Sequence, residues 1–515
     1  MKRLLRKHLF EGDILKLMGI VALAKPLGMV VQMLLANYFG AGEKYDAYAL
    51  ALFLVSYVGS VVGRVYTSVV IPYTIKLRRE LSERDLFSFQ NAAILVFIVP
   101  TALYTLLLMT QGDLVIRLAG PELPQATRGY AVDMLNAMAL PGMLLLLVAM
   151  LKAILNIHDQ YRLATAMPVV NSMAMLVGVV AFHGRYGIWS VPIGFALSNL
   201  VQLVVLGWSA ARQGFLSWRR PRFPAGSLRR IWSLGWMMLV SQSIITMYQF
   251  VDKMFATGLE PGSISSISYS MTLLNFGTQM FTFTLVTVMF TRMSEMLSRD
   301  GMGELNTYVR DNLRRVTRIL APFSLAVSLA SVEIIRVLYQ HGAFTAEDTV
   351  RTSGALAVYI LGLPGLIANN ILSRIFHSLQ RMHEKILLAL QYLVTNVVGN
   401  LLLVDRFGVT GLAVATVVTI TIHLYLSFWV LHRYRIGLDA RRLAVITTRH
   451  YAIMGATAAL FLLLGLDELC NGVADRGTTP GALAVGVLKG TVVLALYFVL
   501  FTVQHRARAL LRRSR

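Results

Sequence analysis

Ionisable side chains stand inside apolar stretches of this chain, where each must face water or a partner. Lys25 lies in the middle of one such stretch, beside Pro26 and Gly28, and Asp46 and Arg64 follow it. A charge at membrane depth is costly unless it lines an aqueous cavity or meets a counter-charge. An ammonium at Lys25 suits an anionic substrate such as a lipid pyrophosphate, which supplies that counter-charge. We therefore expect a cationic cavity.

A second group of residues has the oxygen atoms that a small cation needs. Asn396 and Asn400 share one face of a predicted helix, Thr416 lies on the next helix, and Asp252 is a carboxylate on an earlier one. Carboxylate, amide, hydroxyl and backbone oxygens are the hard ligands that Na⁺-like ions prefer. Interhelical hydrogen bonding is the alternative use of Asn and Thr, and the commoner one in membrane bundles. The spacing alone favours interhelical hydrogen bonding over a cation site.

The elements that carry these residues are apolar helices. The chain has 515 residues, of which 56% are hydrophobic and only 14% are charged, with a mean hydropathy of +0.63. A soluble protein of ordinary composition has about 25% charged residues. Apolar stretches of about 20 residues, long enough to cross a bilayer as helices, recur along the chain. The composition predicts an all-α integral membrane protein.

The net charge of +22 follows a topological pattern. Basic residues gather in every second predicted loop, as the positive-inside rule requires of cytoplasmic loops. Both ends of the chain are basic, which predicts two cytoplasmic termini in a multi-pass membrane protein. Such segments lie near anionic lipid, so we do not expect a nucleic-acid partner. The clusters are found at 1–7, 76–84, 212–223, 310–318, 432–442 and 505–515.

Fourteen spanning helices are predicted. Their ranges are 14–39, 47–73, 91–111, 130–156, 162–182, 187–211, 230–256, 264–291, 316–339, 351–377, 384–404, 409–431, 447–466 and 482–504.

Similar segments recur at an offset of about 220 residues. Val31 aligns with Val251, residues 152–162 with 374–385, and 187–198 with 408–419. Such duplication is common in secondary transporters that enclose a substrate site between two lobes. We predict two six-helix lobes in a parallel pseudo-twofold repeat, followed by two added helices. The predicted domains are a first lobe at 1–211, a cytoplasmic linker at 212–229, a second lobe at 230–442, and the last two helices with a basic tail at 443–515.

No motif for catalysis is present in the sequence. It contains no phosphate-binding GxxxxGK[ST], no HExxH and no CxxC, and the single Cys470 excludes an intramolecular disulfide. The loops are too short to hold the acidic residues of a membrane glycosyltransferase. We therefore predict a transporter rather than an enzyme, with no cofactor apart from a possible Na⁺ coupling ion.

Three segments resemble the MurJ (MviN) family of lipid II flippases, in the MOP exporter superfamily. Residues 36–52 resemble its FGAG-x-x-x-DA signature, 338–349 its F-x-x-G-x-FT-x-x-D loop, and 153–162 its AILN segment. The resemblance covers nearly the whole chain. It implies a two-lobed flippase that moves an undecaprenyl-pyrophosphate glycolipid to the outer leaflet by alternating access, with partners among membrane lipids and glycan polymerase or synthase machinery.

The resemblance also implies site residues. Its Na⁺ site would fall on Asp252, Asn396, Asn400, Thr416 and the carbonyl of Leu412. Its substrate cavity would include Lys25, Asp46 and Thr272. The family's helix 2 arginine falls on Gly59, and Arg64, more than a turn further on, is predicted as a cavity residue from its charge at membrane depth.

The chain departs from the family pattern at cavity arginines. Lys25 and Val31 replace two of them in the first helix, and Thr272 replaces another in the eighth. Arginine grips phosphate with two hydrogen bonds and lysine does not, so the phosphate contacts must differ here. The leading hypothesis is a flippase for a lipid II-like peptidoglycan precursor. The alternatives are a flippase for an exopolysaccharide or O-antigen repeat unit, and a cation-coupled small-molecule antiporter similar to the MATE branch.

Overall fold

The structure is a computed structural model that describes residues 19, 24–216, 220–282, 289, 296, 302–379, 381–433, 440–474 and 478–513. The described residues form helices joined by turns, with no strand among them. The all-α prediction is therefore confirmed. The chain divides into two compact units, Met1–Ile264 and Ser265–Arg515.

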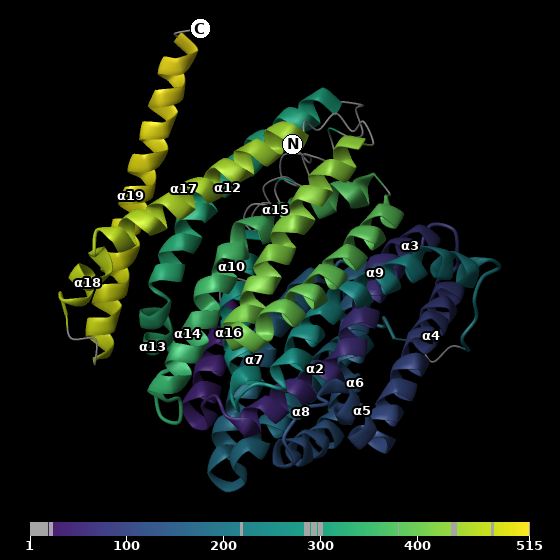
Figure 1. The fold of residues 1–515 in the computed structure, drawn as a ribbon. Coiled ribbons are helices and arrows are strands. Elements are labelled where there is room, and N and C mark those ends of the chain that lie inside the picture. The colour runs from purple at the N-terminus through teal and green to yellow at the C-terminus, as the bar shows by residue number, and fades with distance from the viewer. Residues whose placement is uncertain are drawn as a thin grey trace. The chain divides into compact units, whose positions relative to one another are not determined.

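The first unit is built around α6, against which α2, α4 and α8 pack. Helices α7 and α8 form an antiparallel hairpin, and α9 packs against α2 and η1. A helix over 24–39 precedes these elements. Their bounds are α2 Glu43–Val65, η1 Tyr66–Val70, α3 Ile71–Leu77, α4 Glu83–Thr110, α5 Gly112–Ala119, α6 Gln125–Ile157, α7 Tyr161–Tyr186, η2 Gly187–Trp189, α8 Ser190–Arg212 and α9 Ser227–Ala256 (Figure 1).

In the second unit, α14 and α15 pack against α16, and α12 and α13 are covered by the C-terminal helices α17 and α19. The short α18 lies between α17 and α19 (Figure 1). The bounds are α10 Ser263–Phe281, α12 Met302–Leu329, α13 Ser331–Tyr339, α14 Ala346–Tyr359, η4 Ile360–Gly362, α15 Leu363–Ser378, α16 Met382–Arg433, α17 Ala440–Leu463, α18 Leu466–Asn471 and α19 Thr479–Arg513.

The compact units do not coincide with the predicted domains. The predicted linker at 212–229 divides the two repeats, whereas the first compact unit continues to Ile264. The reason is the packing of α9 against α2 and η1. The domain limits drawn from the repeat thus stay a prediction about the duplication.

The hairpin of α7 and α8 has a counterpart within α16, at the offset of the sequence repeat. Gly187 (φ +54°) turns the chain between α7 and α8, and Gly408 (φ +53°) breaks α16 in the same way. Only glycine adopts this left-handed conformation readily. Beyond the turn, a Cβ on Gly178 would lie 2.7 Å from Cα of Gly194, and one on Gly399 would lie 2.9 Å from Cβ of Ala415. Small residues therefore bring the two arms together in both hairpins.

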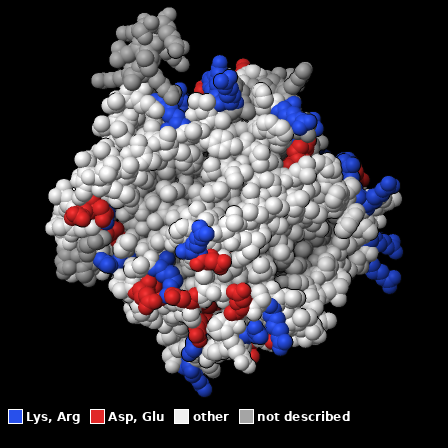
Figure 2. Space-filling model, viewed as in Figure 1, with Lys and Arg blue, Asp and Glu red and all other residues white. Residues whose placement is uncertain are grey.

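The number of spans is not confirmed as fourteen. Eight helical stretches of the described chain are long and apolar enough to cross a membrane, or nine if the bent pair α12–α13 counts as one. The predicted single span at 316–339 is wrong in its shape, because α12 and α13 meet at an angle of 69°. Hydropathy is continuous through this bend and could not reveal it. Most of the face seen in Figure 2 carries no charged residue, and charged side chains are costly within a membrane.

Candidate functional site

A cavity of about 310 Å³ in the first unit opens beside Arg64, in the last turn of α2. Its floor is made of small residues because α2 packs closely on α6. A Cβ on Gly63, for example, would lie 3.1 Å from Cβ of Ala149. Thr67 and Ser60 add hydroxyl groups to the wall. Arg64 is the one charged side chain among the described residues that line the cavity.

The backbone beside Arg64 is irregular. The π-helical turn η1 follows α2 directly, and Thr67 Oγ1 donates to the carbonyl oxygen of Arg64 at 2.9 Å. Such π turns inside helices are frequent at functional sites. The exposed guanidinium donates from Nη1 to Oε1 of Gln242 on α9, across 3.4 Å. Arg64 is thus held at the mouth of the cavity with several donors left for a ligand.

Lys25 belongs to the same unit as Arg64, and its side chain is partly buried. Three residues further on, a Cβ on Gly28 would lie 3.8 Å from Oγ of Ser172, so the first helix passes α7 here. Lys25 is not among the residues that line the Arg64 cavity. Its role in substrate binding stays a prediction.

Asp46 is buried, with 5% of its surface exposed. Its Oδ2 accepts a hydrogen bond of 2.6 Å from the backbone N–H of Gly262, which precedes α10. Nearby, Nζ of Lys253 donates to the carbonyl oxygen of Ala49 at 2.9 Å. Asp46 therefore ties the start of α2 to the loop that follows α9. Any contact that it makes with substrate stays a prediction.

Two of the family-like segments have a structural explanation. In the first, Gly40 has φ +62° and Gly42 caps α2, so these glycines form the turn that places Asp46. In the second, Thr345 and Asp348 form a capping box at the start of α14, in which each side chain accepts the other's backbone N–H. These motifs stabilise the starts of α2 and α14.

The predicted cation ligands of the second unit are buried together. Asn396 Nδ2 donates to Oγ1 of Thr416 at 3.3 Å, and Asn396, Asn400 and Leu412 are fully buried. Their repeat counterparts in the first hairpin are apolar: Met175, Val179 and Phe195 stand where Asn396, Asn400 and Thr416 do. The hairpin of α7 and α8 therefore packs without polar side chains at these three positions.

Two further predicted site residues are Asp252, a cation ligand, and Thr272, a substrate-cavity residue. Asp252, in the last turn of α9, is 1% exposed and belongs to the first unit. Thr272 on α10 donates from Oγ1 to the carbonyl oxygen of Ser268, in its own helix. No group of three or more His, Cys, Asp or Glu that could hold a metal ion occurs among the described residues. The grouping of Asp252 with the second-unit ligands stays a prediction.

The structure also shows charged contacts that sequence reasoning missed. Lys489 of α19 forms ion pairs with Glu333 of α13 (3.0 Å) and Asp467 of α18 (2.7 Å), and its side chain is 3% exposed. Lys152 of α6 donates to Oε1 of Gln202 on α8. A lysine alone in an apolar span was the only available signal, because the partners are distant in sequence.

Comparison with known proteins agrees with this architecture. The family described as "Lipid II flippase MurJ" matches residues 35–480. A probable lipid II flippase of Synechocystis is 24% identical over 448 residues, covering 82% of each chain. One of Vibrio cholerae is 24% identical over 524 residues and covers 96% of each. The lipid II flippase of Thermosipho africanus is 25% identical over 393 residues, 76% of this chain and 79% of that protein.

Solved structures share the fold. A lipid II flippase MurJ in an inward closed conformation has a TM-score of 0.78 at 20% identity and covers 95% of this chain and 98% of that one. An inward-facing multidrug MATE transporter of the MOP superfamily has a TM-score of 0.65 at 13% identity, over 80% of this chain and 94% of that one. With the family match spanning most of its length, this chain belongs to the MurJ family of lipid II flippases.

Proposed function

We propose that this protein is a flippase that moves lipid II, a polyprenyl-pyrophosphate-linked saccharide, across the bacterial inner membrane by alternating access. The observation that carries the proposal is the family match over residues 35–480. Relatives with the same description match over most of their own length. This membership favours lipid II over an exopolysaccharide or O-antigen unit, and over a small-molecule antiporter.

The chemistry of the Arg64 cavity supports an anionic cargo. Arg64 offers a planar fork of donors that matches phosphate oxygens, and no carboxylate is among the described residues lining the cavity. A cavity for cationic compounds would need the opposite charge. Since Lys25 and Thr272 stand where the family pattern has arginines, Arg64 takes a larger share of the phosphate contact.

The proposal is tested by flipping of fluorescent lipid II in proteoliposomes. Arg64→Gln removes the guanidinium, and we expect initial rates to fall about 10- to 100-fold, as the loss of a charge-assisted hydrogen bond implies. Lys25→Ala and Asp46→Ala should abolish flipping while the protein stays folded. Arg117→Gln is the control, because Arg117 is exposed and paired with Asp113 in its own helix. Normal flipping by Lys25→Ala and Arg64→Gln would refute the cationic cavity.

We also propose a Na⁺ site formed by Asp252, Asn396, Asn400, Thr416 and the carbonyl of Leu412. The burial of the two amides beside Thr416 supports it, since the equivalent hairpin packs with apolar residues at these positions. The donors are all oxygen atoms, as a hard cation requires. Bound Na⁺ would supply the positive charge that balances the buried carboxylate.

A thermal-unfolding series in NaCl and in choline chloride tests this site. We expect Na⁺ to raise the midpoint of the parent protein, and the effect to vanish in Asp252→Ala and Thr416→Val. Thr421→Val is the control, because Thr421 bonds a carbonyl of its own helix one turn away. An absence of Na⁺ stabilisation in the parent would remove the site and leave the flippase proposal standing.

The basic loops and the proposed function also predict the topology and the partners of the protein. We propose that both termini are cytoplasmic, on the basis of the basic residues in alternate loops. A lipid II flippase delivers its cargo to enzymes that polymerise glycan, which are the partners we expect. Reporter fusions at each terminus test the orientation, and an outer location of either terminus would contradict it.

A further inference from the structure

A pocket of about 390 Å³ lies in the first unit, away from the Arg64 cavity. Chain segments at the end of α3, the start of α4, and the ends of α6 and α8 surround it. Because successive helices run in alternate directions, these ends share one side of the unit. The basic clusters at 76–84 and 212–223 predict that this side is cytoplasmic. The pocket therefore lies where the helices of a membrane protein meet lipid headgroups.

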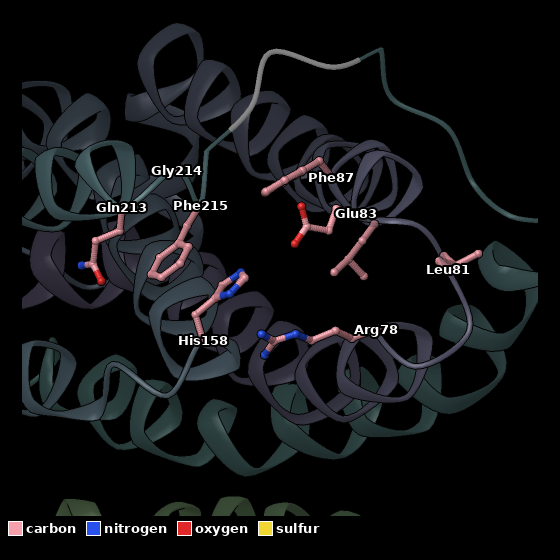
Figure 3. Close-up of a pocket in the computed structure, with 9 residues that line it drawn as sticks. Arg78, Leu81, Glu83, Phe87, His158, Gln213, Gly214 and Phe215 are labelled. Atoms are coloured by element: carbon pink, nitrogen blue, oxygen red, sulfur yellow. The ribbon is translucent and has the colours of Figure 1, made fainter.

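One wall of the pocket carries a fixed guanidinium. Arg78 Nη1 donates to the carbonyl oxygen of Ile157 at 3.1 Å, which holds the side chain against the last turn of α6. A guanidinium has five N–H donors. Figure 3 shows it directed into the same open space as the ring of His158 and the carboxylate of Glu83. Arg78 thus has further donors for an anionic ligand.

His158 adds a second donor beside Arg78. Its ring stacks on Phe215, with 3.9 Å between centroids and an interplanar angle of 6°. Burial, and then the positive charge of Arg78, lower the pKa of His158 from 6.5, so the ring is neutral at pH 7. Its Nε2 is buried and has no hydrogen-bond partner among the described residues. A ligand oxygen at this nitrogen would satisfy a polar atom that is costly to leave unbonded.

Glu83 gives the pocket a negative charge opposite the guanidinium. It stands in the first turn of α4, where a carboxylate is stabilised by the helix dipole. No ion pair joins Glu83 to Arg78 in the described part of the chain. The two side chains therefore present opposite charges to one ligand instead of neutralising each other. Leu81 and Phe87 supply apolar surface beside them.

We infer that this pocket binds an aminoethyl phosphate group, supplied by the headgroup of phosphatidylethanolamine. Its phosphate is held by Arg78 and by Nε2 of His158, its ammonium by Glu83, and its glycerol region by Leu81 and Phe87. A purely anionic headgroup would meet the carboxylate of Glu83, and a purely cationic one would meet Arg78. The lipid is the source because the pocket lies at the ends of spanning helices.

Native mass spectrometry of the full-length protein, titrated with lipids of matched acyl chains, tests the inference. We expect phosphatidylethanolamine to bind about tenfold more tightly than phosphatidylglycerol, which lacks the ammonium, and phosphatidylcholine, which lacks N–H donors. Arg78→Gln, Glu83→Gln and His158→Phe should each remove most of this preference. His158→Phe keeps an aromatic ring against Phe215 and removes the ring nitrogens.

Matched controls separate the pocket from general surface charge. Arg79→Gln and Glu80→Gln remove the same charges from neighbouring exposed positions that do not line the pocket, and both should keep the lipid preference. Equal binding of the three lipids by the parent would overturn the inference, as would an equal loss in the control variants. Soluble phosphoethanolamine that competes as well as the lipid would refute the lipid as the source. Thermal midpoints in phosphatidylglycerol nanodiscs check that each variant is folded.

Discussion

The ion pair between Lys489 and Glu333 gives the sharpest test of the second unit. It joins α19, outside the duplicated helices, to α13 inside them, with side chains that are 3% and 1% exposed. Asp467, the second partner of Lys489, is 41% exposed. Replacing Lys489 by Met keeps the length of the side chain and removes its charge. Glu333 is then left buried without that partner.

The cost of Lys489→Met can be estimated from buried ion pairs in other proteins. Removing one partner of a buried ion pair is costly because the other charge stays buried without that partner. Breaking buried ion pairs costs about 3–5 kcal/mol in other proteins. We therefore expect Lys489→Met to lower the free energy of opening α18 and α19 by about 3–4 kcal/mol. The double variant with Glu333→Gln should recover most of it.

Cys470 reports this opening directly. It is the only cysteine of the chain, it is 2% exposed, and it lies on α18 with Asp467. Its maleimide labelling therefore measures how often α18 separates from its neighbours. A decrease of about 3–4 kcal/mol in the free energy of opening corresponds to labelling about 100- to 1000-fold faster.

The control uses an exposed ion pair of the first unit. Arg117 pairs with Asp113 in α5 at 2.7 Å, but both side chains are more than half exposed. Arg117→Met should cost less than about 1 kcal/mol and change the labelling less than about fivefold. Lys489→Met labelling as slow as the parent protein at pH 7 would refute the reasoning.

Three further predictions concern packing, capping and pH. Gly178→Ala should destabilise the protein by about 1–3 kcal/mol in thermal unfolding, because its Cβ would lie 2.7 Å from Cα of Gly194; Gly184→Ala, with open space around it, should not. Thr345→Ala should cost about 1 kcal/mol through loss of the capping box, read as faster hydrogen exchange at the start of α14; Ser353→Ala, further along α14, should leave that exchange unchanged. His158 has a folded pKa below its ordinary 6.5, so the unfolded state binds more protons; its contribution to stability is full above about pH 6.5 and is lost as the pH falls. His158→Phe should flatten that dependence in unfolding measured from pH 7.5 to 5, and an unchanged slope would contradict it.

Part of the candidate site could be predicted because ionisable residues are rare in apolar helices. Arg64, Asp46 and Asp252 were found this way, and the structure places Arg64 at a cavity. What each contacts could not be predicted. Asp46 bonds the N–H of Gly262, 216 residues away, and no local pattern specifies a partner at that distance. The buried pair Asn396 and Asn400 was found because four-residue spacing is a local property of a helix.

The sequence by itself determined the helical membrane class, the duplication and the family. These conclusions depend on hydropathy, on motifs and on the offset between similar segments, all of which are properties of the sequence. Gly187 and Gly408 stand at equivalent positions of the two similar segments, and both have the positive φ that turns the chain between two helices. The tertiary structure alone decided the 69° bend between α12 and α13, the partner of Lys489 and the pocket at Arg78. The bend leaves no mark in the hydropathy, and the other two features join residues far apart in sequence that only packing brings together.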